Sequence, residues 1–325
     1  MPSKPFRLVF LPPLPDVHRG WARALARDIP GLEVVVADST AEAESVIADA
    51  DGALGVLPKD LLAKAGKIRW LQSHQAAPPA GYYYPELIAH PLQVTNMREI
   101  FNDHIGAHIM AYVLAFARGL HYYIPQQSHG EWAPRPLDEG VLHLAETTAL
   151  IVGAGGIGAE AARLAAAFGI TVIATDARRT TPPPGVAELH PADALDQLLP
   201  RADFVILTVP HTPATEGFMN AARFHLMKPG AFFINIGRGM TTRLDDLVSA
   251  LASGHIAGAA LDVFEQEPLR ADHPLWTMPN VLITPHTAGF GPHLDERRYE
   301  ILRDNCRAMM TGGALRNVVD KAMWF

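Results

Sequence analysis

Cysteine, clustered basic residues and long apolar runs are scarce in this chain, and each shortage excludes a class of protein. The single cysteine, Cys306, excludes an internal disulfide framework and suits a reducing compartment. A net charge of −7 without a long basic run disfavours a nucleic-acid-binding surface. No apolar run reaches the roughly 18 residues that a membrane span needs, and residues 1–16 are too rich in proline for a signal peptide. We therefore expect a cytoplasmic protein that binds neither nucleic acid nor membranes.

The chain does contain an alternation of short apolar runs and helical patterns. Its 325 residues exceed the usual length of one domain, and 49% of them are hydrophobic, which is enough to fill cores. Apolar residues recur with helical spacing at 18–29 and 41–50, between runs that predict strands. These predicted strands lie at 7–11, 33–37, 52–57, 68–72 and 92–96. The alternation favours a doubly wound parallel sheet with helices on both faces.

The same alternation restarts after a long apolar helix predicted at 104–120 and a Pro- and Gly-containing stretch at 124–137. Six further strands are predicted, at 149–153, 171–175, 204–209, 231–236, 257–263 and 281–285. Residues 292–310 predict a closing amphipathic helix. The chain is therefore expected to be α/β, with a second doubly wound unit after the first.

A nucleotide-binding signature follows the first strand of this second unit. Gly153, Gly155 and Gly158 form a G-x-G-x-x-G pattern that opens an Ala-rich predicted helix. In that context the first glycine permits a tight turn, the second lets the backbone approach a pyrophosphate, and the third allows close helix–strand packing. The free N–H groups of a helix N-terminus favour phosphate. We therefore expect a dinucleotide site, in preference to a glycine-rich turn without a ligand.

The residue that ends the next strand, Asp176, bears on the choice of cofactor. It stands where an acid accepts hydrogen bonds from the adenosine ribose. Its carboxylate would repel a 2′-phosphate, which favours NAD over NADP. Arg178 and Arg179 leave NADP open, because either could pair with that phosphate, although both could equally be solvated loop residues.

Three charged or titratable side chains follow neighbouring strands of the second unit. Arg238, Glu267 and His286 come after the fourth, fifth and sixth of its predicted strands. Ligands bind outside the carboxyl ends of parallel strands. There Arg238 could hold a substrate carboxylate, His286 could donate a proton, and Glu267 could orient the imidazole and favour its charged form. This set suits the reduction of a keto acid by a nicotinamide, which supplies the hydride.

Each of these residues also has an ordinary structural interpretation. Arg238 could pair with backbone carbonyls, Glu267 could begin a turn, and His286, one of 15 histidines, could satisfy a strand end. Their convergence on one edge of a sheet favours a chemical role over three separate structural ones.

With these motifs the chain resembles the D-isomer-specific 2-hydroxyacid dehydrogenase family. The resemblance covers nearly the whole chain and is strongest at 153–158, 202–220, 226–239, 247–269 and 273–289. It implies that Arg238, Glu267 and His286 are the catalytic residues, and that Asp262 reaches the nicotinamide. Together with the glycine loop, it gives these expected cofactor-binding residues: Gly153, Gly155, Gly156, Ile157, Gly158, Asp176, Arg178, Val209, Pro210, Thr215, Ile236, Asp262 and Gly289.

The resemblance also implies an architecture and an assembly. A Rossmann dinucleotide-binding domain, 101–289, would be inserted into a flavodoxin-like substrate domain made of 1–100 and 290–325. Members of the family are usually homodimers, and the region that pairs them includes 100–140 in this chain.

The chain departs from the family pattern in the loop that should hold the substrate. In many relatives this loop reads Ala-Gly-Val, and its backbone N–H groups bind the substrate carboxylate. Ala76 and Ala77 are the expected substrate-binding residues here, together with Arg238. Ala77 replaces the glycine and Pro78 the next residue of this altered loop, Ala76 to Pro79. Proline has no N–H to donate, so we expect one donor to be lost.

Two histidines of the long predicted helix raise the possibility of a metal site. His104 and His108 lie four residues apart, a spacing that can share a metal ion. His108 also stands where glutamate is common in the family. No third ligand accompanies them, so we interpret both as helix-surface or packing residues and expect no metal.

The expected function is therefore an NAD(P)-dependent dehydrogenase. It would interconvert a small 2-keto acid, such as glyoxylate or hydroxypyruvate, and its D-2-hydroxy acid. One alternative is a corepressor-like scaffold that senses NAD(H) without useful turnover; the altered substrate loop favours it and the intact Arg–Glu–His set argues against it. The other alternative is a dehydrogenase that acts on a donor such as formate or phosphite.

Overall fold

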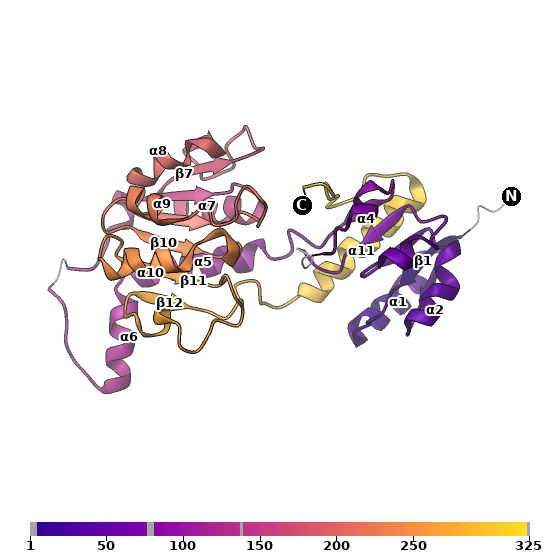
Figure 1. The fold of residues 1–325 in the computed structure, drawn as a ribbon, viewed down its shortest axis with the longest axis horizontal. Coiled ribbons are helices and arrows are strands. Elements are labelled where there is room, and N and C mark those ends of the chain that lie inside the picture. The colour runs from indigo at the N-terminus through magenta and orange to yellow at the C-terminus, as the bar shows by residue number, and fades with distance from the viewer. Residues whose placement is uncertain (1–4, 77–80, 137–138, 324–325) are drawn as a thin grey trace. The chain divides into compact units, whose positions relative to one another are not determined.

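The computed structural model describes residues 5–76, 81–136 and 139–323, and the chain divides into two compact units (Figure 1). Unit 1 comprises Met1–Ile100 and Pro292–Phe325, and unit 2 comprises Phe101–Gly291. Each unit is built on one sheet whose paired strands are all parallel. The prediction of two doubly wound α/β domains is therefore confirmed.

The sheet of unit 1 has five strands among the described residues, in the order β2-β1-β3-β4-β5. They are β1 (Phe6–Phe10), β2 (Leu32–Val36), β3 (Gly52–Leu54), β4 (Trp70–Gln72) and β5 (Gln93–Thr95). The three inner strands are buried almost throughout, because helices cover both faces of a parallel sheet, and their sequences are correspondingly apolar. This strand order is that of the flavodoxin-like fold.

The helices of unit 1 come from both ends of the chain. They are α1 (Asp16–Asp28), α2 (Thr40–Val46), α3 (Lys59–Leu62), α4 (Pro85–Ala89) and α11 (Leu294–Thr311). Ser39 caps α2 by accepting the backbone N–H of Glu42 at 3.2 Å. The C-terminal helix α11 is tied to the sheet, because Nδ2 of Asn305 donates to Oε1 of Gln72 at 3.0 Å.

The sheet of unit 2 has seven strands in the described ranges, in the order β12-β11-β10-β9-β6-β7-β8. They are β6 (Thr148–Val152), β7 (Thr171–Asp176), β8 (Glu188–Pro191), β9 (Phe204–Leu207), β10 (Phe232–Asn235), β11 (Gly258–Leu261) and β12 (Val281–Ile283). β6 pairs with β7 on one side and with β9 on the other, so the direction in which successive strands are added to the sheet reverses there. Ligands of Rossmann folds bind outside this switch point, at the carboxyl ends of the strands.

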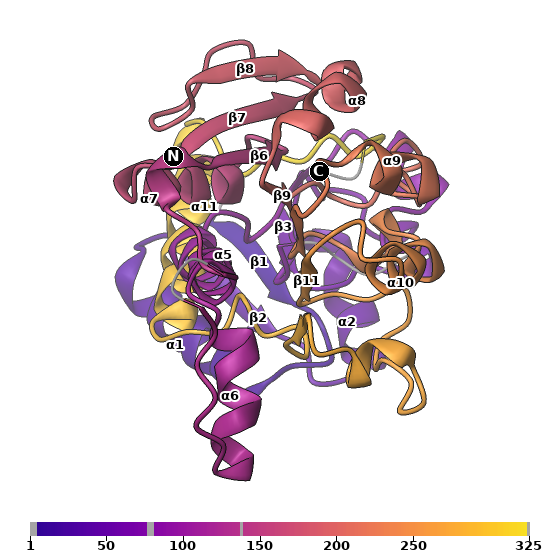
Figure 2. The ribbon, with the colours of Figure 1, turned by 90° about the vertical axis from the view of Figure 1, so that its left-hand side faces the viewer.

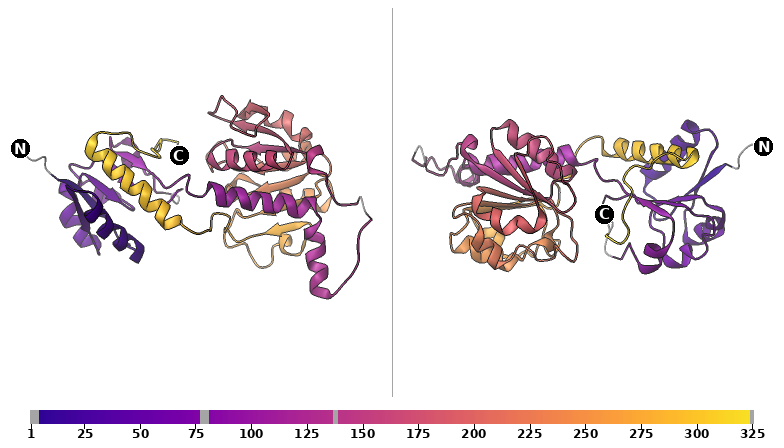
Figure 3. Two further views of the ribbon diagram at one scale, coloured as in Figure 1. Left: turned by 180° about the vertical axis from the view of Figure 1, so that it is seen from behind. Right: turned by 90° about the horizontal axis from the view of Figure 1, so that it is seen from above.

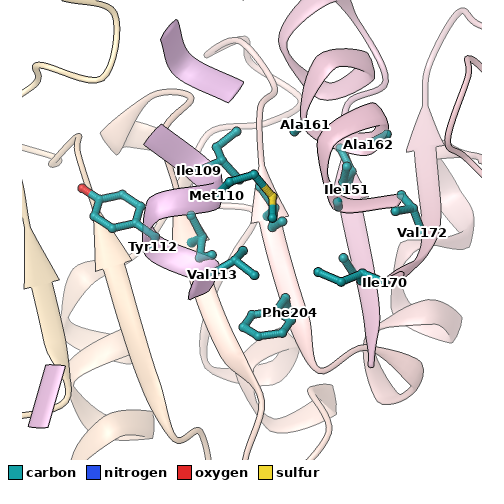
Figure 4. Close-up of a cluster of buried hydrophobic side chains, with 14 of the residues drawn as sticks. Ile109, Met110, Tyr112, Val113, Ile151, Ala161, Ala162, Ile170, Val172 and Phe204 are labelled. Carbon is teal, nitrogen blue, oxygen red and sulfur yellow. The ribbon is translucent and has the colours of Figure 1, made fainter. Parts of the chain in front are cut away.

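Helices cover both faces of this sheet (Figures 1 and 3). One face carries α5 (Asn102–Ala117) and α7 (Gly156–Ala167), and the other carries α8 (Leu195–Leu198), α9 (Ala221–Leu226) and α10 (Leu244–Ala252). Under α5 and α7, side chains such as Ile109, Val113, Ile151 and Phe204 form one buried cluster (Figure 4). The small side chains of α7 in this cluster allow the two helices to pack closely.

Two elements of unit 2 differ from the predictions. β8 forms the edge of the sheet beside β7, although no strand was predicted there. α6 (Leu120–His129) occupies part of the Pro- and Gly-containing stretch, for which no helix was predicted, and Pro125 lies inside it. This helix extends away from the sheet of unit 2 and buries none of its side chains (Figure 2).

Short 3₁₀ turns complete the described secondary structure: η1 (Ile47–Asp49), η2 (Leu144–Glu146), η3 (Ala192–Ala194), η4 (Leu199–Arg201), η5 (Gly239–Thr241) and η6 (Pro274–Thr277). Within the ranges that the structure describes, no helix combines the length and the apolar character that crossing a membrane requires.

Candidate active site

The glycine loop of unit 2 makes the turn from β6 into α7, beside the switch point of the sheet. Gly153 has a φ of +101°, in the left-handed region that side chains rarely adopt. A Cβ on Gly158 would collide with the carbonyl oxygen of Gly153, so this position has no room for a side chain. A Cβ on Gly155, in contrast, would have nothing within 4 Å. The backbone is therefore open at Gly155, where a ligand can approach it.

The N-terminus of α7 completes a cradle for phosphate groups. Gly155 is the N-cap of this 12-residue helix, whose first N–H groups lack partners within the helix and carry the positive end of its dipole. The side-chain amide of Asn102, at the start of α5, lies against Gly156, since a Cβ there would be 2.6 Å from its Nδ2. These groups fit the pyrophosphate of a dinucleotide. Asn102 was not predicted, because only the packing of α5 beside α7 brings it to the loop.

The end of β7 carries one acidic residue, Asp176, and is followed by two basic residues, Arg178 and Arg179. Oδ1 of Asp176 accepts the backbone N–H groups of Arg178 and Arg179, each at 2.8 Å. The carboxylate thereby holds the turn from which both exposed arginines extend. The position expected for the adenosine ribose therefore combines a group that favours NAD with two groups that can pair with the extra phosphate of NADP.

The loop after β9 closes against the glycine loop. Oγ1 of Thr208 donates to the carbonyl oxygen of Gly153 at 2.6 Å. A Cβ on Gly153 would also lie 2.9 Å from Cγ1 of Val209, so the two loops are in close contact. The hydroxyl of Thr215 donates to the carbonyl oxygen of Pro210 at 2.7 Å and closes the rest of the loop. Thr208 was missed by the sequence analysis, because an isolated threonine after a strand gives no signal.

Arg238 follows β10 between two glycines, and close contacts explain both of them. A Cβ on Gly237 would lie 2.6 Å from the carbonyl oxygen of Val209. A Cβ on Gly239 would overlap the backbone of Phe264, in the segment after β11. The loop that carries Arg238 is therefore packed tightly between the loops after the two neighbouring strands.

Hydrogen bonds hold the backbone and the side chain of Arg238. Its carbonyl oxygen accepts Nδ2 of Asn235 at 3.2 Å and Oγ1 of Thr241 at 2.6 Å. Its guanidinium donates through Nη1 to the carbonyl oxygen of Gly237 at 2.6 Å. Burial lowers the pKa of Arg238, and the nearby charge of Glu267 opposes that shift. A guanidinium stays charged in such surroundings, so a partly buried cation lies within the electrostatic reach of a carboxylate at this edge.

The structure brings Glu267 and His286 into direct contact. Nδ1 of His286 lies 2.7 Å from Oε2 of Glu267. The other oxygen, Oε1, accepts the backbone N–H of Phe264 at 3.0 Å, which fixes the orientation of the carboxylate. The imidazole is 51% exposed. Because Nδ1 is engaged, Nε2 is the ring nitrogen that would exchange a proton with a ligand.

Asp262, directly after β11, holds the loop that carries His286. Its carboxylate is buried and accepts the backbone N–H groups of Thr287 at 2.8 Å and Ala288 at 2.9 Å. Its carbonyl oxygen accepts the N–H of His286 at 2.8 Å. A contact of Asp262 with a nicotinamide stays a prediction, whereas its anchoring of the histidine loop is a feature that the sequence did not reveal.

Three other predicted cofactor contacts lie in different surroundings of unit 2. Ile157, on the first turn of α7, is partly buried against the core cluster. Ile236, after β10, is buried within that cluster. Gly289 lies against Phe101, whose ring would be 3.3 Å from a Cβ at that position.

The predicted substrate loop belongs to unit 1 and follows β4. The carbonyl oxygen of Ala76 accepts Nδ2 of Asn96 at 2.9 Å, so this end of the loop is held by the segment after β5. Ala77, Pro78 and Pro79 lie outside the described residues. Their expected effect on substrate binding stays a prediction.

The two histidines at helical spacing on α5 contact different partners. Nε2 of His108 lies 3.1 Å from Oγ1 of Thr284, while the imidazole of His104 lies against Gly291. In the parts of the chain that the structure describes, no three His, Cys, Asp or Glu side chains are grouped closely enough to hold a metal ion.

Comparison with known proteins places these features in a family. Residues 110–288 match the family described as D-isomer specific 2-hydroxyacid dehydrogenase, NAD binding domain. The chain is 33% identical to glyoxylate/hydroxypyruvate reductase B of Citrobacter koseri over 320 residues, which cover 94% of this chain and 95% of that protein. It is 34% identical to human glyoxylate reductase/hydroxypyruvate reductase over 215 residues, or 66% of this chain and 65% of that one.

Solved structures show the same architecture. A D-isomer specific 2-hydroxyacid dehydrogenase from Xanthobacter autotrophicus, in complex with NADPH and MES, superposes with a TM-score of 0.84 at 30% identity and covers 98% of this chain and 99% of its own. An NADPH-dependent glyoxylate/hydroxypyruvate reductase from Sinorhizobium meliloti, in complex with NADP and sulfate, gives a TM-score of 0.81 at 29% identity, with coverages of 98% and 100%.

Proposed function

This chain belongs to the D-isomer specific 2-hydroxyacid dehydrogenase family, a family of NAD(P)-dependent oxidoreductases, and we propose that it reduces a small 2-keto acid to its D-2-hydroxy acid. Glyoxylate and hydroxypyruvate are the substrates that the names of its relatives suggest. Residues 101–289 would form the dinucleotide-binding domain, and 1–100 with 290–325 the substrate domain. The reaction is reversible in principle, and the reductive direction is the one named in these relatives.

Arg238 is proposed to bind the carboxylate of the keto acid. A guanidinium offers two parallel N–H groups that match a carboxylate, and partial burial strengthens this interaction relative to water. Glycines on both sides and the hydrogen bonds to its carbonyl oxygen hold the backbone, so the side chain starts from a fixed point. A fixed cation orients the substrate carbonyl at the same edge of the sheet as His286.

His286 is proposed to donate the proton that completes the reduction. A bound nicotinamide supplies a hydride to the carbonyl carbon. The Nε2–H of a protonated His286 gives its proton to the carbonyl oxygen, which leaves the alcohol and a neutral imidazole. The remaining Nδ1–H continues to donate to Oε2 of Glu267, so the ring keeps its orientation through the step.

The cofactor is proposed to be NADH in preference to NADPH, with both able to bind. Asp176 supports NADH, because its carboxylate stands where the ribose hydroxyls are expected and would repel a 2′-phosphate. Arg178 and Arg179 extend from the same turn and provide the charge through which NADPH could be accepted. Two solved relatives are bound to NADPH or NADP, which supports the proposal that NADPH can also bind.

The contact between Nδ1 of His286 and Oε2 of Glu267 at 2.7 Å is the observation that carries this proposal, because it pairs an acid–base group with an orienting carboxylate at the cofactor edge. The test is to follow oxidation of NADH and NADPH by the purified protein with glyoxylate, hydroxypyruvate and larger 2-keto acids. The matched variant is His286→Gln, which keeps a hydrogen-bonding side chain but has no proton to give. We expect turnover with a keto acid and a loss of about 100-fold or more in the variant.

Each other outcome contradicts the proposal in a different way. Binding of NADH without turnover of any keto acid would support a dinucleotide-sensing scaffold. Reduction of NAD⁺ by formate or phosphite, in the absence of keto-acid turnover, would support a dehydrogenase of that type. Near-normal turnover by His286→Gln would remove His286 from the mechanism.

The protein is also proposed to act as a homodimer in the cytoplasm. In the described part of 100–140, Leu120 and Ile124 on α6 and Trp132 beyond it are exposed, and Trp132 is 96% exposed. Apolar side chains on a projecting helix (Figure 2) mark an association surface, and pairing two copies would cover them. Light scattering should show a dimer that Ile124→Glu weakens; a monomeric parent protein would contradict this.

The single, buried cysteine supports the proposed location in the reducing cytoplasm.

A further inference from the structure

We propose that His108 and Tyr112 on α5, acting through the hydroxyl of Thr284, are positioning residues for His286. This inference rests on the proposed function, because it concerns how the proton donor is held. Thr284 is the first residue after β12. Its Oγ1 lies 2.5 Å from Oδ1 of Asp262, 2.5 Å from the hydroxyl of Tyr112 and 3.1 Å from Nε2 of His108.

The chemistry of these four groups fixes the direction of every hydrogen bond. An ionised carboxylate can only accept, so the Thr284 hydroxyl donates its one proton to Asp262. Its two lone pairs then accept from the Tyr112 hydroxyl and from Nε2–H of His108. The other acceptor near the Tyr112 hydroxyl, the carbonyl oxygen of Leu261, is much farther away at 3.4 Å. The imidazole of His108 is therefore the Nε2–H tautomer when it is neutral. One hydroxyl with one donor bond and two acceptor bonds is fully satisfied.

Burial supports this assignment of protons. Burial lowers the pKa of His108, and the charge of Asp262 opposes that shift. Burial also raises the pKa of Tyr112. A neutral imidazole and a neutral phenol both have a proton to donate. Their rings meet edge to face with centroids 4.7 Å apart, so each restricts the other.

The position of α5 explains why these two side chains reach the loop. His108 and Tyr112 are four residues apart and therefore lie on the same face of the helix. The ring of Tyr112 sits beside the buried cluster of unit 2, and its hydroxyl points away from that cluster (Figure 4). The phenol thus has an apolar body in the core and a polar end at Thr284, which gives the hydroxyl a rigid support.

The carboxylate of Asp262, which accepts the hydrogen bond from Thr284, holds the loop of His286 in an unusual conformation. Asp262 accepts the backbone N–H groups of Thr287 and Ala288, the two residues that directly follow His286. His286 has a φ of +54°, in the left-handed region that is unfavourable for a residue with a side chain. Such a conformation persists only where the surroundings enforce it. The hydrogen bond from Thr284 orients the Asp262 carboxylate, which enforces this conformation. His108 and Tyr112 on α5 in turn orient the Thr284 hydroxyl.

This arrangement predicts a specific effect on the proton-donation step. Without the Thr284 hydroxyl, Asp262 can rotate, the loop relaxes, and the imidazole leaves its productive position. The substrate carboxylate is proposed to bind Arg238, and the dinucleotide is proposed to bind mainly the glycine loop and the end of β7. Only the contact expected between Asp262 and the nicotinamide would be disturbed, so binding of both ligands should change little. A displacement of about 1 Å in a catalytic group can cost up to roughly 100-fold in rate.

The experiment compares Thr284→Val, which removes the hydroxyl at constant shape, with Thr284→Ser, which restores it. We expect kcat for keto-acid reduction to fall about tenfold or more in Thr284→Val. KM and the dissociation constant of NADH should stay within about twofold, and Thr284→Ser should recover most of kcat. Tyr112→Phe should lower kcat by a smaller factor. Tyr299→Phe is the matched control, because it removes a phenol hydrogen bond to Asp28 in unit 1 and should leave kcat unchanged.

A double-mutant cycle separates this inference from the proposed function. In a His286→Gln background, Thr284→Val should have no further effect on kcat, because the group that Thr284 positions is gone. A full additional loss in that background, or an unchanged kcat in the single Thr284→Val variant, overturns the positioning role. Near-normal turnover of His286→Gln alone instead contradicts the proposed function.

Discussion

His286 and Glu267 are joined by a contact of 2.7 Å between Nδ1 and Oε2, although they lie 19 positions apart in the chain. They follow the neighbouring strands β12 and β11, whose pairing sets the distance between the two loops. The second oxygen of Glu267 is held by the N–H of Phe264 at 3.0 Å. A carboxylate fixed in this way selects one orientation of the imidazole and leaves Nε2 to exchange the proton.

Reduction of the keto acid should require the charge of Glu267 and not only the shape of its side chain. Glu267→Gln keeps the size of the side chain and a group that can accept from Nδ1, but it removes the negative charge beside the ring that is proposed to donate the proton. We expect kcat for keto-acid reduction to fall about 100-fold while the dissociation constant of NADH is unchanged. Steady-state kinetics and a fluorescence titration with NADH measure both quantities. A kcat within threefold of the parent enzyme would show that the charge is not needed.

The parts of the site that could be predicted are those encoded by local pattern. The glycine loop follows an apolar strand and opens a helix, so its geometry is set by residues that are close in sequence. Arg238, Glu267 and His286 each follow a short apolar strand, and parallel strands end at the same edge. The full strand order was not needed to place them together, because β10, β11 and β12 are consecutive in the chain and are neighbours in the sheet.

The parts that could not be predicted depend on contacts between distant segments. β8 has no apolar run and becomes a strand only because β7 offers its edge for pairing. Asn102 reaches the glycine loop because α5 packs beside α7, and Thr284 meets Tyr112 across 172 positions of sequence. The helix α6 escaped prediction for a different reason, since it buries none of its residues and contains a proline.

Arg238 should act on the keto acid and not on the cofactor. Arg238→Lys keeps the charge but loses the two-pronged geometry, and we expect KM for the keto acid to rise about tenfold or more. The dissociation constant of NADH should stay within twofold. Arg243→Lys, a change of the same kind at the exposed Arg243, is the control and should leave KM unchanged. Equal effects of both variants would argue against a carboxylate-binding role for Arg238.

Asp176 should set the preference between the two reduced cofactors. Asp176→Asn retains the oxygen that accepts the N–H groups of Arg178 and Arg179, so the turn should persist. It removes the repulsion of a 2′-phosphate, which is worth about 1 kcal/mol at a partly exposed site, or roughly fivefold in affinity. We expect the ratio of kcat/KM for NADPH to that for NADH to rise by this factor, and Arg178→Ala in the same background to lower it. An unchanged ratio would place the discrimination elsewhere.

The stability of unit 1 should fall in mild acid because of one buried histidine. Burial, with smaller contributions from His74 and Arg298 that outweigh the opposing charge of Asp295, lowers the pKa of His18 to about 4. In the unfolded chain this group takes up a proton near pH 6.5, whereas the folded protein resists it until about pH 4. The unfolded state therefore binds more protons between these values, and the free energy of unfolding decreases as the pH falls, by up to about 3 kcal/mol. Urea unfolding at several pH values should show a shallower dependence for His18→Gln; equal slopes would exclude His18 as the source.

Substitution by alanine at two glycines of the same loop should affect different properties: NADH binding at Gly155 and stability at Gly158. Gly155 has φ −69° and ψ −160°, an extended conformation open to alanine, and a Cβ there meets nothing within 4 Å. Gly155→Ala should therefore fold as well as the parent protein, but its methyl group would stand where the pyrophosphate approaches. We expect the dissociation constant of NADH to rise about tenfold or more with the melting temperature almost unchanged.

Gly158→Ala forces a methyl group against the carbonyl oxygen of Gly153, which belongs to the backbone and cannot move away freely. Overpacking of this kind costs about 1–3 kcal/mol, and each kcal/mol lowers the melting temperature of a domain of this size by about 2–4 °C. Thermal unfolding and NADH titration of both variants distinguish a glycine required for ligand access from one required for helix–strand packing. If Gly155→Ala binds NADH with the parent affinity, the dinucleotide does not approach the backbone at that point, and the cradle must lie elsewhere on the loop.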